Sequence, residues 1–175
     1  MPLPQVLTFP NPVNEKAARV VAGGVVVLGV VTLLTQKWWL AALLAVGFAL
    51  RVAAGPRFSP LGRLAVHVVA PRFGAPRLVP GPPKRFAQAI GLAVSAGAAV
   101  AALGFGATGL ASVLLGVLVV FALLESALGF CAGCWAFGHL MRLGVIPEET
   151  CAACSDLSLR APHDPDLLRI PAPRP

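Results

Sequence analysis

Four apolar segments of similar length limit what this chain can fold into. They cover residues 18–35, 38–54, 86–105 and 108–128. A helix that rises about 1.5 Å per residue needs roughly 20 residues to cross the hydrocarbon core of a bilayer, and each segment approaches that length. The sequence therefore predicts an all-α, polytopic membrane protein with four transmembrane helices, of which the second is the shortest.

The composition agrees with a membrane protein. The chain is 57% hydrophobic and 12% charged, whereas soluble domains carry about 25% charged residues. A net charge of +7 is also a property of nucleic-acid-binding proteins. Here, however, the basic residues are spread through loops beside apolar segments, with little aromatic interleaving. We therefore expect the lipid bilayer, and no nucleic acid, as a partner.

The ends of the spans carry their own expectations. Trp38 and Trp39 should lie at one membrane interface, and the side chain of Arg51 should extend toward the other. Residues 1–19 lack a short basic segment and a following cleavage site, so 18–35 is expected to be a retained helix and not a signal peptide. Small residues that let helices pack closely recur along the third span, at Gly91, Ser95 and Ala99.

The connections differ in length. Residues 36–37 and 106–108 are tight turns, so the spans should form two antiparallel hairpins. The central loop, 55–85, is rich in proline and is not expected to contain a fifth span. We expect residues 1–155 to form a single membrane domain and the Pro-rich residues 156–175 to be a disordered tail.

A short interfacial helix is expected within the central loop. Ser59 can serve as its N-cap, and Pro60 suits its first turn. Its apolar face would then carry Leu61, Leu64, Ala65 and Val68. Pro71 is expected to end this helix.

Positive charge is concentrated on one side of the predicted arrangement. Of the 14 Lys and Arg residues, Lys37 alone falls in a hairpin turn on the opposite side. Four spans place both termini and the central loop together, and the positive-inside rule makes that side cytoplasmic. We expect a multi-pass protein of the cell membrane with both termini in the cytoplasm.

Two CxxC pairs follow the fourth span. Cys131 and Cys134 lie within GFCAGCW, and Cys151 and Cys154 lie within CAAC. Structural disulfides are rare in the cytoplasm, where thiols stay reduced. These cysteines are therefore expected to bind metal or to perform redox chemistry, and not to brace the fold.

Thiol redox or sulfur-relay chemistry at the membrane boundary is one hypothesis. If Gly129 and Phe130 end the fourth helix, Cys131 begins a new helix, where free N–H groups and the helix dipole stabilise its thiolate. Cys134, one turn later, would be the resolving thiol. The second pair would accept electrons or a persulfide from the first by exchange, so all four cysteines are candidate catalytic residues.

A structural zinc site is the alternative, in a membrane adaptor without catalysis. Two CxxC pairs separated by residues 135–150 have the spacing of four-thiolate sites, with Cys131, Cys134, Cys151 and Cys154 as ligands. The segment after Cys134 looks helical up to Gly144, and a second helical turn starts at Pro147. If these two helical arms were straight, Cys134 would lie about 15 Å from the turn that joins them, but Cys151 only about 6 Å from it. One arm would have to break, for example at Gly138.

Glu125 lies inside the apolar fourth segment, shortly before the first CxxC pair. A carboxylate within a membrane is costly and usually functional. Glu125 is therefore a candidate catalytic residue that should face the bundle interior. It would accept a thiol proton or pair with Arg51 or Arg85. His139 is read as an interfacial or capping residue, with a role as ligand or base as the alternative.

The stretches GPRFSPLGRLA, GPPKRFAQAIG and LESALGFCAGCWAF resemble the signatures of a bacterial integral-membrane family, domain of unknown function family 4395. The resemblance covers about residues 11–137, and the last stretch is the most specific. It implies a multispanning protein of the bacterial inner membrane, with thioredoxin-like or rhodanese-like partner proteins. The motif falls on Glu125, Gly129, Cys131, Gly133 and Cys134.

Other function classes stay open. A channel or transporter would usually show more polar residues within its spans, or helices broken at the membrane midplane. A plain adaptor would use the cysteines to clamp a surface for a partner. The sequence contains no Ser/His/Asp grouping, phosphate loop or dinucleotide fingerprint.

Overall fold

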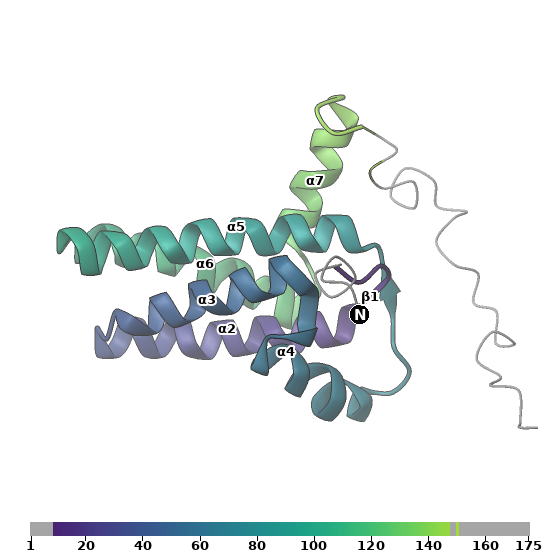
Figure 1. Ribbon diagram of the computed structural model, residues 1–175, viewed down its shortest axis with the longest axis horizontal. Coiled ribbons are helices and arrows are strands. Elements are labelled where there is room, and N and C mark those ends of the chain that lie inside the picture. The colour runs from purple at the N-terminus through teal and green to yellow at the C-terminus, as the bar shows by residue number, and fades with distance from the viewer. Residues whose placement is uncertain (1–8, 148–149, 151–175) are drawn as a thin grey trace, which may run out of the picture.

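The computed structural model describes residues 9–147 and 150 and consists of a helical bundle from which a further helix, α7 (Ala132–Arg142), projects near one end (Figure 1). Within these residues three helical stretches, Glu15–Thr35, Gly81–Gly104 and Thr108–Leu128, are long and apolar enough to cross a membrane, and Trp39–Ala54 is a shorter apolar helix. The all-α, multi-pass architecture is therefore confirmed, with three helices of full spanning length and one shorter helix.

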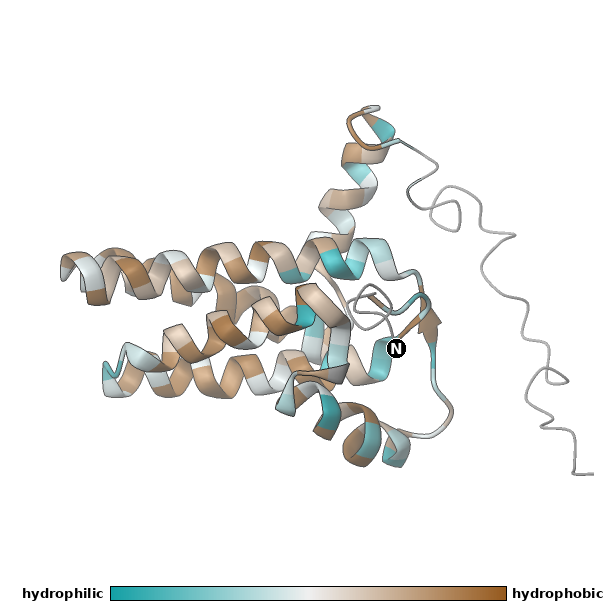
Figure 2. Cartoon of the chain, viewed as in Figure 1, coloured by the Kyte–Doolittle hydropathy of each residue, from teal (hydrophilic) through white to brown (hydrophobic). Residues whose placement is uncertain are grey.

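The long helices of the bundle lie side by side. Their labels and bounds are α2 (Glu15–Thr35), α3 (Trp39–Ala54), α5 (Gly81–Ala99) with its π-helical continuation η4 (Val100–Gly104), and α6 (Thr108–Leu128). Helix α2 packs mainly on α6, and α3 packs mainly on α5. Hydrophobic residues run along these helices, while hydrophilic residues gather at the ends of the bundle (Figure 2). Large apolar side chains such as Val27, Val113 and Val120 point outward, as lipid-facing residues would.

Two helices begin earlier than the apolar segments suggested. Helix α2 begins at Glu15 because the side chain of Asn14 caps it, accepting a hydrogen bond from Lys16 N at 3.0 Å. Helix α5 begins at Gly81, because the two prolines that looked like loop occupy the first turn, where their missing N–H groups cost nothing. Thus the charged residues at these helix starts belong to the bundle.

The first hairpin turn differs from expectation at one tryptophan. Gln36 adopts the left-handed conformation, with φ 54°, and its N–H closes α2 on the carbonyl of Thr32. Trp39 is exposed, as an interfacial residue would be, but Trp38 is buried in the main core. The indole of Trp38 therefore packs within the bundle instead of marking an interface.

The central loop contains the expected short helix. It is built from η1 (Gly55–Arg57), α4 (Pro60–Leu64), the π-helical η2 (Ala65–Val69) and the 3₁₀ turn η3 (Ala70–Phe73). Ser59 caps α4 by accepting a hydrogen bond from Gly62 N at 3.3 Å. Pro71 does not end the helical run as expected, because it lies in the first turn of η3, which proline tolerates.

The short helix packs against the start of α2. Ala65 is buried there and Leu61 is packed beside it, whereas Leu64 and Val68 are exposed. The predicted apolar face is therefore divided between the bundle and the surroundings.

A two-stranded antiparallel ladder, not expected from the sequence, ties the N-terminal segment to the central loop. Strand β1 (Val13–Asn14) pairs with β2 (Leu78–Val79), with Val13 opposite Val79. The Glu15 N–H extends the contact by donating to the Arg77 carbonyl at 2.8 Å. This ladder brings Glu15 and Arg77 close to the end of the bundle where α6 terminates.

Helices α3 and α5 are held together by close packing and by a buried arginine. A Cβ at Gly91 would overlap the ring of Phe48, so the small residue is needed there. The side chain of Arg51 does not extend toward an interface as expected. It is buried, lies over the Phe48 ring at 4.4 Å, and donates to Gln88 Oε1 at 2.8 Å and Ser59 Oγ at 3.3 Å.

We predict that Gly91→Val destabilises the bundle. The added side chain would push into the Phe48 ring, and overpacking of this kind costs about 1–3 kcal/mol. Thermal unfolding in detergent should show a lower midpoint for this variant. Ala93→Val is the matched control, because Ala93 is exposed on the same helix. Equal effects of the two substitutions would show that the α3–α5 contact is not tight.

Candidate functional site

The site begins where α6 ends. Gly129 adopts the left-handed conformation, with φ 73°, and its N–H bonds to the Glu125 carbonyl at 3.0 Å. Cys131 then takes an extended conformation as the N-cap of α7 (Ala132–Arg142). The chain therefore breaks at Gly129 and Phe130, and Cys131 opens a new helix with Cys134 one turn later.

Helix α7 is anchored on the first turns of α5. Gly133 lies so close to Ala87 that a Cβ on Gly133 would overlap it. One turn along, the ring of Phe137 packs edge-on against Phe86, with centroids 5.6 Å apart. These contacts fix the position of the first cysteine pair relative to the bundle.

The two cysteines of the first pair interact with one another. Cys131 is buried and Cys134 is partly exposed, and both are free thiols. The Cys134 thiol donates a hydrogen bond to the Cys131 sulfur, and this bond is the main cause of the lowered pKa of Cys131. The same interaction raises the pKa of Cys134 well above its usual range, with burial adding to the effect. Cys131 is thus the more acidic thiol.

An ion pair lies next to these thiols. Lys84 Nζ is 2.7 Å from Glu125 Oε1, and the two side chains are only 8% and 15% exposed. Glu125 therefore faces the bundle interior. The sequence had suggested Arg51 or Arg85 as the partner of Glu125, and the structure shows Lys84 in that place. Arg85 instead donates to the Val52 carbonyl at 3.0 Å.

The charges of the ion pair act on Cys131 in opposite directions. Burial and the Glu125 carboxylate oppose the lowering of the Cys131 pKa, whereas the Lys84 ammonium supports it. A smaller contribution in the same direction comes from the Cys134 backbone N–H, although the Cys131 side chain forms no regular capping hydrogen bond. The ammonium group is therefore the nearby charge that favours the thiolate.

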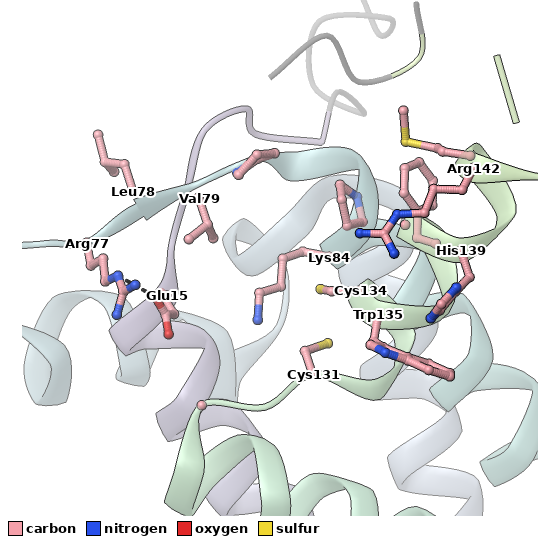
Figure 3. Close-up of a pocket in the computed structure, with 16 residues that line it drawn as sticks. Glu15, Arg77, Leu78, Val79, Lys84, Cys131, Cys134, Trp135, His139 and Arg142 are labelled. Atoms are coloured by element: carbon pink, nitrogen blue, oxygen red, sulfur yellow. Dashed lines mark ion pairs between the residues drawn. The ribbon is translucent and has the colours of Figure 1, made fainter. Parts of the chain in front are cut away.

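A cavity of about 920 Å³ gives access to both thiols. Figure 3 shows Cys131 and Cys134 beside Lys84, with His139 and Arg142 of α7 at the rim. His139 packs edge-on against Trp135 at 4.2 Å between centroids. On the other side Arg77 pairs with Glu15 at 3.0 Å. The cavity thus combines two thiols with several cationic side chains, and its size falls in the range of about 300–1,000 Å³ usual for ligand sites.

The second cysteine pair, Cys151 and Cys154, lies outside the described residues, as do the expected tail 156–175 and residues 148–149. In residues 9–147 and 150, no group of three or more His, Cys, Asp or Glu side chains is placed to hold a metal ion. Helix α7 also continues through Gly138, which was one example of a position where an arm of the zinc arrangement could break.

Sequence reasoning missed Lys84. The residue looked like one of several charges in the central loop, but α5 begins earlier than expected and includes it. The sequence did contain a usable signal. Lys84 follows two prolines that can start a helix, which places it at the start of one span, and Glu125 lies at the end of the neighbouring span, so both residues are at the same membrane level.

Apolar helices of spanning length, arranged in two hairpins with a polar site at one end, define a multi-pass membrane protein. The chain belongs to the family described as Domain of unknown function (DUF4395), whose match covers residues 13–142 and thus includes the bundle, Glu125 and the first CxxC pair. Comparisons with curated proteins and with solved structures gave no match.

We predict opposite effects of the two ion-pair residues on the Cys131 thiol. Glu125→Gln removes a charge that raises the Cys131 pKa, so the pH midpoint of its alkylation should fall. Lys84→Met removes a charge that lowers this pKa, so the midpoint should rise. The measurement is the alkylation rate of Cys131 as a function of pH, because only the thiolate reacts.

Arg85→Met is the matched control for these two variants. It removes an exposed cation that is adjacent in sequence to Lys84. The Arg85 side chain donates its hydrogen bond to the Val52 carbonyl on α3 and not to Glu125. Its midpoint should equal that of the parent protein. Unchanged midpoints in all three variants would leave the Lys84–Glu125 pair with a structural role alone.

Proposed function

We propose that this membrane protein performs thiol-based redox or sulfur-relay chemistry through Cys131 and Cys134 at the membrane boundary. The observation that carries the proposal is the placement of Cys131 at the start of α7, one turn from Cys134 and beside the buried Lys84 ammonium. Nucleophilic cysteines occur at helix starts next to cations, and a second cysteine one turn later resolves the covalent intermediate.

The reaction class is attack on a sulfur–sulfur bond. The Cys131 thiolate attacks a disulfide or persulfide in the 920 Å³ cavity, forming a mixed disulfide and expelling the other sulfur as a thiolate or sulfide. Cys134 then loses its proton and attacks Cys131, which releases the second sulfur of the substrate. The substrate gains two electrons and two protons, and the protein gains one intramolecular disulfide.

The cationic rim supports an anionic substrate or an acidic surface on a partner protein. Arg142 lines the same cavity as the thiols, as do Lys84 and Arg77, whose charges are paired with Glu125 and Glu15. Thioredoxin-like or rhodanese-like proteins, which the sequence resemblance suggested, carry sulfur chemistry suited to such exchange. The second pair, Cys151 and Cys154, would be the next carrier along the chain.

We also propose that this end of the bundle faces the cytoplasm. Lys16, Arg19 and Arg85 lie at the helix ends near the site, whereas Lys37 lies in the hairpin turn at the opposite end. This asymmetry supports a cytoplasmic site by the positive-inside rule.

The first test is thiol reactivity in the full chain, purified in detergent under reducing conditions. Cys131 should alkylate fastest, with a pKa below its usual value, and mild oxidation should form a reversible Cys131–Cys134 disulfide. Cys134→Ala should raise the alkylation midpoint of Cys131, because the main cause of the lowered pKa is removed. Cys131→Ser should lower the alkylation midpoint of Cys134 relative to the parent protein, because the interaction with the Cys131 thiol is the main cause of its raised pKa; burial, which remains, should keep that midpoint above the usual value.

A metal measurement on the same sample separates the two hypotheses about the cysteines. A reactive dithiol should be purified without stoichiometric zinc. One zinc per chain, lost when any one of Cys131, Cys134, Cys151 or Cys154 is replaced by Ser, would contradict the redox proposal, since zinc thiolates react slowly until the metal is removed.

The orientation is tested by labelling single cysteines in a variant that lacks the native four. Lys37→Cys and Arg72→Cys are a matched pair, because both side chains are exposed but lie on opposite sides of the predicted membrane. A membrane-impermeant thiol reagent should label intact cells at position 37 alone, and should label position 72 after permeabilisation. The reverse pattern would place the thiol site outside.

A further inference from the structure

A second cavity lies deeper in the bundle, on the other side of Cys131. Its volume is about 540 Å³, and residues from α2, α5, α6 and α7 line it. Most of its wall is apolar, with Val21, Val25, Val94 and Leu118 among the lining residues. These residues belong to helices of spanning character, so the cavity lies at the level of the hydrocarbon.

The mouth of this cavity faces outward from the bundle. Ile90, Val117 and Phe121 line it and are 41%, 47% and 47% exposed. Large apolar residues on the outer faces of spanning helices contact lipid, so a ligand would enter from the bilayer and not from water.

One end of the cavity is polar. Gln88, Glu125 and Cys131 line it there. Arg51 binds Gln88 Oε1 at 2.8 Å, which leaves the Nε2 hydrogens as the donors that this side chain can offer to a ligand. The cavity is thus amphipathic along its length, with a polar end at the thiol and apolar walls toward the lipid.

Cys131 and Trp135 line both cavities. The Cys131 side chain therefore lies between a cavity with a cationic rim and a cavity that opens to the bilayer. A dithiol in this position can meet a sulfur compound on one side and a lipid-soluble compound on the other.

We propose that the 540 Å³ cavity binds a lipid-soluble quinone that exchanges electrons with the Cys131–Cys134 dithiol. This inference rests on the proposed function. A quinone ring carries two carbonyl oxygens, which suit the Gln88 amide and the thiol end, and its isoprenoid tail suits the apolar wall and the lipid-facing mouth. A phospholipid acyl chain would also match the wall, and its ester could lie beside Gln88, but it carries no group that the Cys131–Cys134 dithiol can reduce.

The exchange balances without another reactant. The two thiols lose two electrons and two protons as one S–S bond forms and two S–H bonds break. The quinone gains both electrons and both protons as two O–H bonds form, which gives the hydroquinone. Glu125 lines the cavity beside Cys131 and is placed to pass a thiol proton to a quinone oxygen.

The experiment uses the full chain with Cys151→Ala and Cys154→Ala, reduced and reconstituted anaerobically in nanodiscs of quinone-free phosphatidylcholine. The probe is decylubiquinone, whose fully substituted ring disfavours stable thiol adducts. We expect one hydroquinone per disulfide formed, and no reaction in a Cys131→Ser variant. Glutathione disulfide, a water-soluble oxidant, is the parallel probe for the first cavity.

Val117→Trp should block the mouth, and Val113→Trp is the matched control. Both valines are exposed on α6 one turn apart, but only Val117 lines the cavity. Val117→Trp should raise the quinone concentration for half-maximal rate about tenfold, equivalent to about 1.4 kcal/mol of binding. Val113→Trp should leave it unchanged. Both variants should react with glutathione disulfide at the parent rate and unfold at the parent midpoint.

The outcomes separate this inference from the proposed function. Oxidation by glutathione disulfide without oxidation by quinone overturns the inference and leaves the dithiol function standing. Equal quinone kinetics in the two tryptophan variants also overturns it, as expected if a phospholipid chain fills the cavity. A dithiol inert to both oxidants overturns both proposals.

Discussion

The contact between Lys84 and Glu125 organises the end of the bundle. A carboxylate at the end of an apolar helix is too costly to leave unpaired, and the ammonium group of Lys84 lies 2.7 Å away in the first turn of α5. This pair joins the start of one spanning helix to the end of another. Helix α7 is anchored on the next residues of α5 through Phe86 and Ala87, so the ion pair and the cysteines lie at the same end of the bundle.

The chain can turn sharply after α6 because the last carbonyls of that helix are satisfied from outside it. Arg19 of α2 donates to the Ser126 carbonyl at 3.1 Å and to the Ala127 carbonyl at 2.7 Å. Helix ends leave such carbonyls without intrahelical partners. With them bonded to a cation, Gly129 can reverse the backbone and Cys131 can start α7. The site therefore depends on contacts between helices that are far apart in sequence.

The sequence was sufficient for the features set by local composition. Length and apolarity predicted the helices, and the Gly129–Phe130 break predicted the new helix at Cys131. The features set by packing were not predictable in this way. Whether Trp38 and Arg51 point inward, and which cation meets Glu125, depends on the rotation and pairing of whole helices. The β1–β2 ladder was missed because two residues per strand leave no periodic pattern.

The charges around Cys131 explain how one site could serve both cavities. Ionised Glu125 and Lys84 nearly cancel, so forming a thiolate at Cys131 adds an uncompensated negative charge in surroundings of low dielectric. If the thiol proton moves to Glu125 instead of to water, the Cys131 thiolate replaces the Glu125 carboxylate as the anion beside Lys84. The net charge of the cluster then stays the same. Such a transfer needs the carboxylate, the ammonium and the thiol in one cluster. The carboxylate also lines the lipid-facing cavity, so in the proposed exchange with a quinone it is placed to pass the same proton to that ligand.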